Sequence, residues 1–416
     1  MNKRPYDYAI IGAGMSGTAF GRLLQMSGEE NFILLERNDE PGGLCRSQAV
    51  NGHVVDTGGG HFLCTKFEEV YRFVFSHMPR EAFNRFGRVS KIKLGEATID
   101  YPLESNIWQL PPEQCADYLM SVLANGESRG LPVPRSFEEW IRWKLGDRVA
   151  EKYMLPYNRK VWGLEAAEMD VDWLHKIPRM DVREIVLACL RRHADAGKMP
   201  SHGEFYYPRE GGFQRVFDAI LAPLADRVQR GTGVSMIERH PDGGLILEGR
   251  FWAKRVVNTA PWAALRESPF LSGEVQASLE RLKHSSLVVS LHEKASDTDA
   301  HWCYEPSMEL RHHRDFFIHN YAPHSAENGI MRETNLKRWD GPRGALNHFR
   351  NDYAYPIPSL GWAGAIADVL ARAEAEGIFG LGRWGQWQYF NSDVCIHEAM
   401  RLAVRLGHMR WQESIK

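Results

Sequence analysis

Long apolar segments are missing from this sequence of 416 residues. No run approaches the roughly 18 residues that a membrane-spanning helix needs. The basic start, Met1–Arg4, is followed by only a short apolar stretch and then by glycines, so we expect no signal peptide. The formal net charge is -2, which gives no overall attraction to nucleic acid or to an anionic membrane. These features predict a protein with neither a membrane span nor a nucleic-acid partner.

Metal-binding and disulfide patterns are also missing. The 6 cysteines are scattered and form no CxxC pair, and the 17 histidines show no HExxH spacing. Scattered single cysteines are typical of reduced thiols in the cytoplasm and are not typical of a disulfide framework or a zinc site. We therefore predict a cytoplasmic protein without a metal site.

A dinucleotide-binding pattern occupies the first 36 residues. The short apolar run Tyr8–Ile11 leads into a glycine turn, Gly12–Gly17. An amphipathic stretch follows to Met26, and then a second apolar run, Phe32–Leu35, which Glu36 closes. The order strand, tight turn, helix, strand and acid is the context in which a GxGxxG motif indicates nucleotide binding.

Each residue type in this pattern has a physical purpose. Gly12 permits the tight turn, Gly14 lets the backbone approach a pyrophosphate, and Gly17 lets the helix and strand pack closely. The first N–H groups of the helix then face the phosphates, and Glu36 can accept hydrogen bonds from a ribose diol. The expected cofactor contacts of this unit are Gly12, Gly14, Met15, Ser16, Gly17 and Glu36.

Two further glycine clusters favour FAD over NAD. The first follows Glu36 and Arg37 and contains Gly42–Leu44, and the second is Gly58–His61. Glycines are needed where the backbone presses against a phosphate or a flat ring. The arrangement resembles the FAD-containing superfamily of amine oxidases, protoporphyrinogen oxidases and UDP-galactopyranose mutases. The resemblance implies further cofactor contacts at Arg37, Gly43, Leu44, Gly59, Gly60 and His61.

The rest of the chain predicts an α/β protein with a Rossmann-type FAD-binding domain assembled from separated segments. Helical periodicity over 137–148, 149–154 and 182–196 indicates a helical insertion, and the apolar run Arg255–Pro261 is typical of a buried strand of the returning FAD-binding domain. We expect a mixed α+β substrate domain after it. The expected segments are FAD-binding over 1–100, a helical insertion with substrate-site residues over 101–200, FAD-binding over 201–270, a sheet-containing substrate domain over 271–370, and a closing FAD-binding segment with a C-terminal helix over 371–416.

Several peptides narrow the resemblance to UDP-galactopyranose mutases. They occur in collinear order over nearly the whole chain and include Tyr101–Ile107, Pro156–Gly163, Trp302–Tyr304, Tyr355–Pro358 and Gly382–Tyr389. The resemblance implies substrate contacts at Tyr101, Asn106, Asn158, Trp162, Trp302, Tyr304, Arg314, Tyr321 and Tyr355, and cofactor contacts at Val234, Arg383 and Tyr389.

The resemblance also implies a reaction. Reduced flavin N5 acts as nucleophile at the anomeric carbon of a nucleotide-linked pyranose, which is returned as a furanose. This explains why the sequence shows no Ser-His-Asp set and no paired catalytic carboxylates. Implied partners are a nucleotide-sugar substrate and an external reductant such as NAD(P)H, in carbohydrate biosynthesis. The expected catalytic residues are His61, Arg314, Tyr355 and Tyr389, with Arg314 as the principal anion anchor.

Two departures leave the substrate open. Ile177 stands where the family has a second diphosphate-binding arginine, and Glu104 replaces a neutral glutamine near the sugar. A different nucleotide sugar, or a substrate without a diphosphate, is compatible with these changes. Two other classes also stay open: a flavin oxidase or dehydrogenase of the amine oxidase and protoporphyrinogen oxidase type, and a non-catalytic FAD-binding protein.

Overall fold

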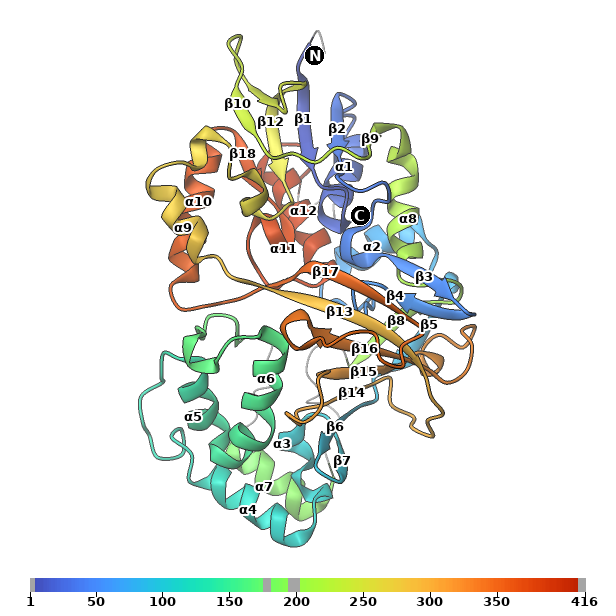
Figure 1. Ribbon diagram of the computed structural model, residues 1–416, viewed down its shortest axis with the longest axis vertical. Helices are drawn as coiled ribbons and strands as arrows, with labels where there is room; N and C mark the ends of the chain where they lie inside the picture. The colour runs from blue at the N-terminus through green and yellow to red at the C-terminus, as the bar shows by residue number, and fades with distance from the viewer. Residues whose placement is uncertain (1–3, 175–180, 194–202, 411–416) are drawn as a thin grey trace.

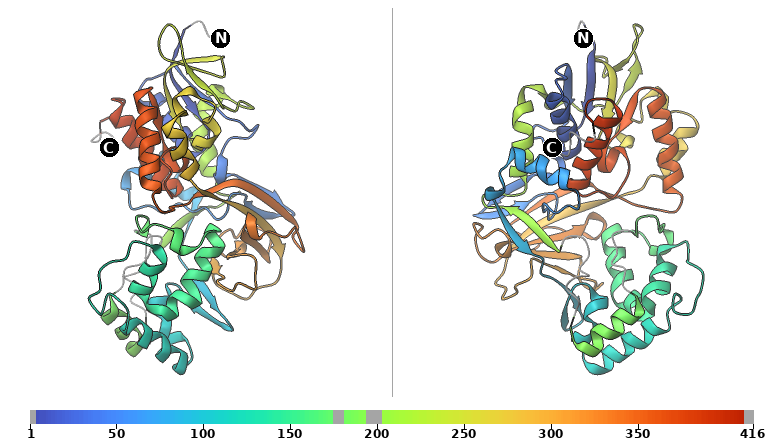
Figure 2. Two further views of the ribbon diagram at one scale, coloured as in Figure 1. Left: turned by 60° about the vertical axis from the view of Figure 1, so that its left-hand side comes forward. Right: turned by 180° about the vertical axis from the view of Figure 1, so that it is seen from behind.

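A computed structural model describes residues 4–174, 181–193 and 203–410 of the chain (Figure 1). A sheet flanked by helices lies at one end, a second sheet crosses the middle, and a group of helices forms the other end (Figures 1 and 2). Ile177 lies outside the described residues.

The first sheet has the strand order β10-β11-β12-β1-β2-β9, with β18 also paired to β12. Its strands are β1 (Tyr6–Ile11), β2 (Phe32–Leu35), β9 (Val228–Gln229), β10 (Ile237–Arg239), β11 (Leu245–Leu247), β12 (Phe251–Asn258) and β18 (Ile378–Gly380). β1 pairs in parallel with both β2 and β12. Strands from the beginning, middle and end of the chain therefore form one layer, as predicted for a Rossmann-type domain built from separated segments.

The central strand β1 is buried on both faces. Tyr8 and Ile10 belong to one apolar cluster and Ala9 and Ile11 to another, because successive side chains point to opposite sides of a strand. The first cluster includes residues of α1 (Met15–Met26) and α12 (Ser392–Arg405), and the second includes residues of α10 (Trp362–Ala375). A continuous apolar run such as Tyr8–Ile11 is what a parallel strand between two helical layers requires.

The second sheet has the order β17-β13-β16-β15-β14-β6-β7. Its strands are β6 (Ser90–Leu94), β7 (Ala97–Asp100), β13 (His284–Glu293), β14 (Trp302–Tyr304), β15 (Arg314–Phe317), β16 (Gly329–Asn335) and β17 (Asn347–Pro356). β6 pairs in parallel with β14, so Ser90 lies opposite Trp302. The expected first FAD-binding segment, 1–100, thus contributes its last two strands to this sheet.

The remaining elements connect and cover these sheets. Two small antiparallel pairs join β3 (Ser47–Val50) with β4 (His53–Asp56) and β5 (Phe83–Gly87) with β8 (Glu204–Pro208). The helices of the far end are α3 (Leu103–Asn106), α4 (Pro112–Leu123), α5 (Phe137–Val149), α6 (Leu155–Trp162) and α7 (Val182–Arg191). The others are α2 (Glu68–His77), α8 (Gln214–Leu221), α9 (Glu274–Arg281) and α11 (Gly382–Gly385).

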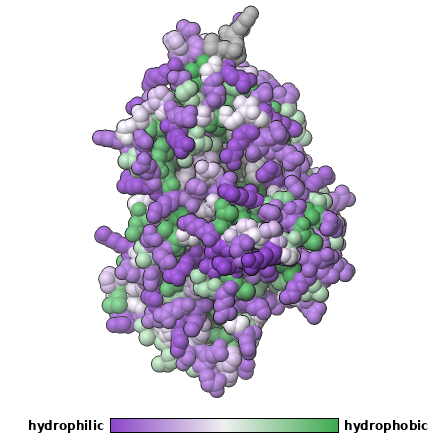
Figure 3. Space-filling model, in the orientation of Figure 1, coloured by the Kyte–Doolittle hydropathy of each residue, from purple (hydrophilic) through white to green (hydrophobic). Residues whose placement is uncertain are grey.

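The surface is mostly polar. Figure 3 shows apolar residues only in small separate areas on the face that it presents. Among the helices of the described residues, none has both the length and the apolar character needed to cross a bilayer.

Candidate cofactor and substrate site

A cavity of about 420 Å³ opens beside the glycine turn that follows β1. Its walls come from this turn, from the second glycine segment, from the turn after β12 and from the region around α11 and α12. The predicted cofactor residues that line it are Gly12, Gly14, Met15, Ser16, Glu36, Arg37, Gly43, Leu44, His61, Val234 and Arg383.

Hydrogen bonds fix the shape of the glycine turn. The N–H of Gly12 donates to the carbonyl of Leu35 at 2.8 Å, and the N–H of Ala13 donates to the Glu36 carboxylate at 2.9 Å. The other Glu36 oxygen accepts both the backbone and the side-chain N–H of Asn38 at 3.0 Å. Glu36 therefore braces the turn in addition to its expected contact with a ribose.

The turn fits a dinucleotide such as FAD. A Cβ atom added to Gly14 would meet no atom within 4 Å, so the backbone there faces open space. Gly14 is also the N-cap of α1, and no side chain caps the first N–H groups of that helix. Uncapped N–H groups at the start of a 12-residue helix bind a phosphate well. The N–H of Gly42 donates to the carbonyl of Ala13, which holds the second glycine segment beside the first.

Four predicted cofactor residues do not line this cavity, namely Gly17, Gly59, Gly60 and Tyr389. A Cβ on Gly17 would stand 2.1 Å from the carbonyl oxygen of Gly12, so Gly17 serves the close packing of α1 on the turn. A Cβ on Gly59 would stand 2.3 Å from a carboxylate oxygen of Glu333. Gly60 and Tyr389 line a neighbouring cavity, as His61 and Arg383 also do. Gly17 and Gly59 line neither cavity.

The second cavity has a volume of about 620 Å³ and lies between the second sheet and the helical end of the molecule. The predicted substrate residues that line it are Tyr101, Asn158, Trp162, Trp302, Tyr304, Arg314 and Tyr355. Asn106 and Tyr321 do not line it. The Asn106 amide donates to the carbonyl of Pro102, and the buried Tyr321 ring packs edge-on against Tyr207. Both side chains thus make packing contacts within the protein.

His61 and Arg383 stand where the two cavities meet, since both line each of them. The Arg383 guanidinium donates to the carbonyls of Phe390 at 2.7 Å and Ala354 at 3.0 Å, which fixes its position. Burial and the nearby Arg383 charge lower the pKa of His61 to about 4. The His61 ring is therefore neutral at pH 7, so it does not provide a cation there.

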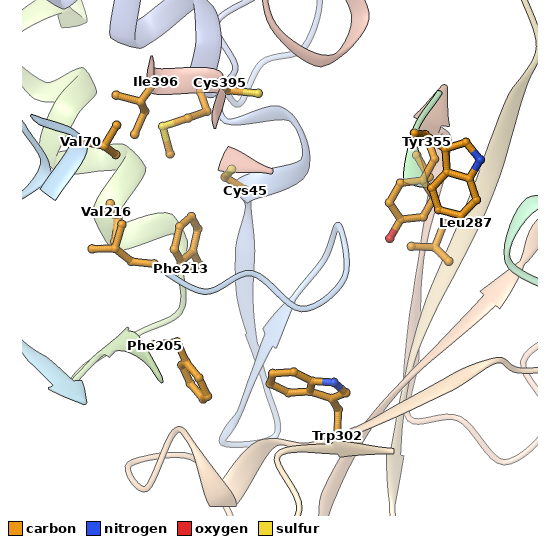
Figure 4. Packing of buried hydrophobic residues seen from close by; sticks show 14 of the residues in the cluster. Cys45, Val70, Phe205, Phe213, Val216, Leu287, Trp302, Tyr355, Cys395 and Ile396 are labelled. Atoms are coloured by element: carbon orange, nitrogen blue, oxygen red, sulfur yellow. The ribbon is translucent and has the colours of Figure 1, made fainter. Parts of the chain in front are cut away.

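Aromatic rings surround the space beyond this junction. The Tyr355 and Tyr389 rings pack edge-on at 5.1 Å, and Trp162 packs against both. Figure 4 shows Phe205 and Trp302 reaching toward the same interior from different strands, with Tyr355 on the opposite side. Burial raises the pKa of both tyrosines, so their hydroxyls stay neutral and can donate hydrogen bonds.

The Arg314 guanidinium is paired inside the protein. Its Nε and Nη2 donate to one Glu333 oxygen at 2.8 and 2.5 Å, and the N–H of Gly60 donates to the other at 3.2 Å. Burial would raise the pKa of Glu333, but Arg314 and His313 outweigh it and hold the pKa at about 2. Glu333 therefore carries a full negative charge that offsets the charge of Arg314.

Comparisons with known proteins agree with this geometry. Residues 10–75 match the model of an NAD(P)-binding Rossmann-like domain. The chain is 22% identical to a probable UDP-galactopyranose mutase of Klebsiella pneumoniae, over 95% of this chain and 93% of that protein. It is 26% identical to the dTDP-fucopyranose mutase of Escherichia coli over 41% of this chain, an alignment that spans 45% of that relative.

Solved structures of two kinds share the architecture. A reduced UDP-galactopyranose mutase superposes with a TM-score of 0.84 at 21% identity, covering 99% of this chain and 96% of the other. The chain has the fold of the UDP-galactopyranose mutases. A putative protoporphyrinogen oxidase from Exiguobacterium sp. 255-15 also superposes, with a TM-score of 0.72 at 15% identity, covering 98% of this chain and 99% of the other. The predicted resemblance and the predicted α/β class are confirmed, and the mutase relatives support the prediction of an enzyme of the mutase type.

Sequence reasoning missed several residues that line the second cavity. Tyr153 and Tyr157 line the second cavity, as does Arg88 just before β6. Tyr157 lies inside the quoted motif at Pro156–Gly163, which was a usable signal. Arg88 carried no signal, because its place in the cavity depends on the pairing of β6 with the distant strand β14.

Glu104 also lines the second cavity, and this residue is 4% exposed. Among the described residues no basic side chain lies within ion-pair distance of it. Burial raises the pKa of Glu104 to about 7. The folded protein therefore binds this proton more tightly than the unfolded chain does between pH 4.5 and 7.

We expect Glu104→Gln to stabilise the protein at high pH. Ionisation of the buried Glu104 destabilises the folded protein. This loss of stability grows as the pH rises from 4.5 to 7 and reaches its full size above pH 7. The variant should gain about 3 kcal/mol in free energy of unfolding at pH 8 and almost nothing at pH 4.5. Urea unfolding of both proteins at the two pH values measures this, and an equal difference at both would contradict it.

Proposed function

We propose that the protein is an FAD-dependent sugar mutase that converts a nucleotide-linked pyranose to the furanose form. The observation that carries the proposal is the meeting of the two cavities at His61 and Arg383. One cavity has a dinucleotide-binding turn, and the other has walls of tyrosine, tryptophan and arginine suited to a sugar linked to an anionic group. The full-length resemblance to a probable UDP-galactopyranose mutase supports the same class of substrate.

FAD would be held by the glycine turn, by Glu36 and by Arg383, and in its reduced form it would supply the nucleophile, flavin N5, for the anomeric carbon. The residues of the second cavity then have separate tasks. Tyr355 and Tyr389 donate neutral hydrogen bonds to anionic oxygens without transferring protons. The edge of Arg314 that does not face Glu333 contributes a further donor at the same wall.

The aromatic walls orient the sugar and exclude water. Trp162, Tyr355 and Tyr389 pack against one another, and Trp302 packs against Phe62 at 5.1 Å. A dry cavity strengthens the interaction between charged substrate oxygens and their donors. It also protects an opened sugar from side reactions. His61, neutral at pH 7, remains able to donate or accept a hydrogen bond beside the flavin site.

The test compares the two redox states of the purified enzyme. Dithionite-reduced enzyme should interconvert the pyranose and furanose forms of a nucleotide sugar from a UDP- and dTDP-linked panel, and oxidised enzyme should not. Product analysis by anaerobic chromatography measures this. The Gly14→Val protein, which we expect to lack FAD, is the control for both states. Equal conversion by reduced and oxidised enzyme would falsify the proposal.

A flavin oxidase is the second candidate. The observation that favours it is the fold shared with a putative protoporphyrinogen oxidase over 98% of the chain. An oxidase would oxidise its substrate as the flavin is reduced, and it would consume oxygen in steady state. Oxygen uptake that depends on the substrate, without sugar isomerisation, would therefore replace the mutase proposal with this one.

A further inference from the structure

The cationic side chains that line the second cavity differ in how their charges are balanced. They are Lys66, Arg88, Arg314 and Arg383. Arg314 is paired with the buried Glu333. Arg383 donates to two backbone carbonyls at the junction with the cofactor cavity. Lys66 lies 5.2 Å from the Phe67 ring centre, at the end of a flexible side chain.

Arg88 is held rigidly without a carboxylate. Its Nε donates to the Ser90 hydroxyl at 2.9 Å, and its Nη2 donates to the Tyr304 hydroxyl at 3.0 Å. The guanidinium carbon lies 4.3 Å from the Tyr101 ring centre and 4.9 Å from that of Trp302. Within the described residues no acidic group reaches ion-pair distance of Arg88. The aromatic faces stabilise the cation but do not cancel its charge.

Tyr304 is oriented by the same cluster. Its hydroxyl oxygen accepts one hydrogen bond from Arg88 and another from the Trp302 indole N–H at 3.0 Å. A hydroxyl that accepts two hydrogen bonds has its own proton left to donate elsewhere. Because Tyr304 lines the cavity, that donor is available to a bound molecule, next to the charge of Arg88.

From these contacts we infer that Arg88 and Tyr304 form an anion-binding subsite of the second cavity, built to hold an anionic oxygen of the substrate. Arg88 supplies the positive charge of the subsite, because the charge of Arg314 is offset by Glu333. Tyr304 supplies a neutral hydrogen-bond donor. The ligand is a phosphate or carboxylate oxygen on a molecule whose ring also packs against the aromatic walls. The inference deepens the proposed function and rests on it only for the identity of the molecule that carries the anion.

The acidic residue Glu104 does not change the assignment of Arg88 to an anion-binding subsite. It lines the same cavity, but its pKa is raised by burial and Arg88 is not among the groups that shift it. Arg88 and Glu104 both act on the Tyr101 hydroxyl, in opposite directions. The two charged groups therefore flank Tyr101 without forming a pair.

The test measures binding to the FAD-loaded enzyme by calorimetry, with UDP, uridine and inorganic pyrophosphate as probes. Arg88→Met keeps most of the side-chain volume and removes the charge. We expect it to weaken UDP binding by roughly 10- to 100-fold, because a charge-assisted contact is lost. Uridine binding should change by less than about threefold, since that probe has no phosphate. Arg88→Lys should restore part of the UDP affinity, because it keeps the charge without the planar fork.

Ser90→Ala is the matched control. It removes one hydrogen bond to Arg88 and keeps the charge, so UDP affinity should fall by less than about threefold. FAD content and melting temperature should match the wild type in every variant. UDP-glucose and UDP-glucuronate form the last pair of probes. If Arg88→Met weakens the binding of UDP-glucuronate alone, a sugar carboxylate lies at Arg88. If it weakens the binding of both equally, the diphosphate lies there.

The two proposals fail separately. Unchanged UDP and UDP-glucuronate affinity in Arg88→Met, with normal binding by the wild type, overturns the subsite and leaves the mutase intact. Failure of the wild type to bind any of these anions also overturns the subsite. Arg88-dependent binding of pyrophosphate, with no contribution from the nucleoside, supports the subsite and counts against a nucleotide sugar as substrate.

Discussion

Gly14→Val should give a folded protein that has lost its FAD. The φ and ψ angles of Gly14 are -88° and -173°, an extended conformation that valine adopts readily. A Cβ there meets no protein atom within 4 Å, so the apoprotein has room for the new side chain. The same side chain would fill the space at the start of α1 that a pyrophosphate needs. We expect FAD affinity to fall at least roughly 100-fold, as measured by flavin absorbance after reconstitution.

Gly17→Ala is the matched control for this experiment, because it adds a smaller side chain three residues away. Its Cβ would stand 2.1 Å from the Gly12 carbonyl oxygen, so the helix must shift away from the turn. We expect a loss of about 1–3 kcal/mol in free energy of unfolding, seen in urea titrations of the FAD-free protein. A Gly14→Val protein that retains FAD, or that unfolds as Gly17→Ala does, would show that Gly14 faces protein and not ligand.

Local sequence was sufficient to predict the strand–helix–strand unit at the start of the chain. The expected strand at Tyr8–Ile11, the helix to Met26 and the strand at Phe32–Leu35 correspond to β1, α1 and β2. These elements are encoded by neighbours in the chain: apolar runs, a glycine turn and a closing acid. The helix expected over 137–148 is likewise observed as α5, whose N-cap Ser136 accepts the N–H of Glu139.

The substrate half depends on contacts between distant residues, which a single sequence does not reveal. Arg314 and Glu333 face each other on the antiparallel strands β15 and β16, and only the register of those strands brings them together. Arg88 meets Tyr304 because β6 pairs with β14. A motif match identifies an arginine or a tyrosine but does not tell what it contacts. The motif match predicts Arg314 as the principal anion anchor, and only the register of the strands shows that Glu333 shares its charge.

The functional assignment also divides into a part that local sequence supports and a part that depends on contacts between distant residues. The dinucleotide turn, the resemblance and the fold agree on a flavoenzyme of the mutase type. Under the proposed function, the chemistry of the substrate depends on the balance of charge in the second cavity, which Arg88 and Glu104 both line. In the proposed subsite the guanidinium of Arg88 favours an anion, whereas a carboxyl with a pKa near 7 offers both a hydrogen-bond donor and an acceptor. Variants of these two residues therefore report on the substrate more directly than variants of the aromatic walls.

Glu333→Gln should cause the largest loss of stability of any single substitution considered for this cavity. The variant keeps the shape of the buried Glu333 side chain but leaves the partly buried Arg314 guanidinium without its counter-charge. Removing one partner of a buried ion pair costs about 3–5 kcal/mol. The N–H of Gly60, which donates to Glu333, would also lose a charged acceptor, so the turn that carries His61 should loosen. Urea unfolding of the holoenzyme at pH 7 measures the loss.

Two further measurements separate an ion pair from simple packing. Because the pKa of Glu333 is depressed to about 2, its contribution is fully present above pH 4.5 and is lost as the pH falls toward 2. The difference between wild type and Glu333→Gln should therefore shrink over that range. The double variant Glu333→Gln with Arg314→Met removes both charges and should be more stable than Glu333→Gln alone. If the effects of the two single substitutions simply add, the charges do not act as a pair, and Arg314 is free to bind the substrate after all.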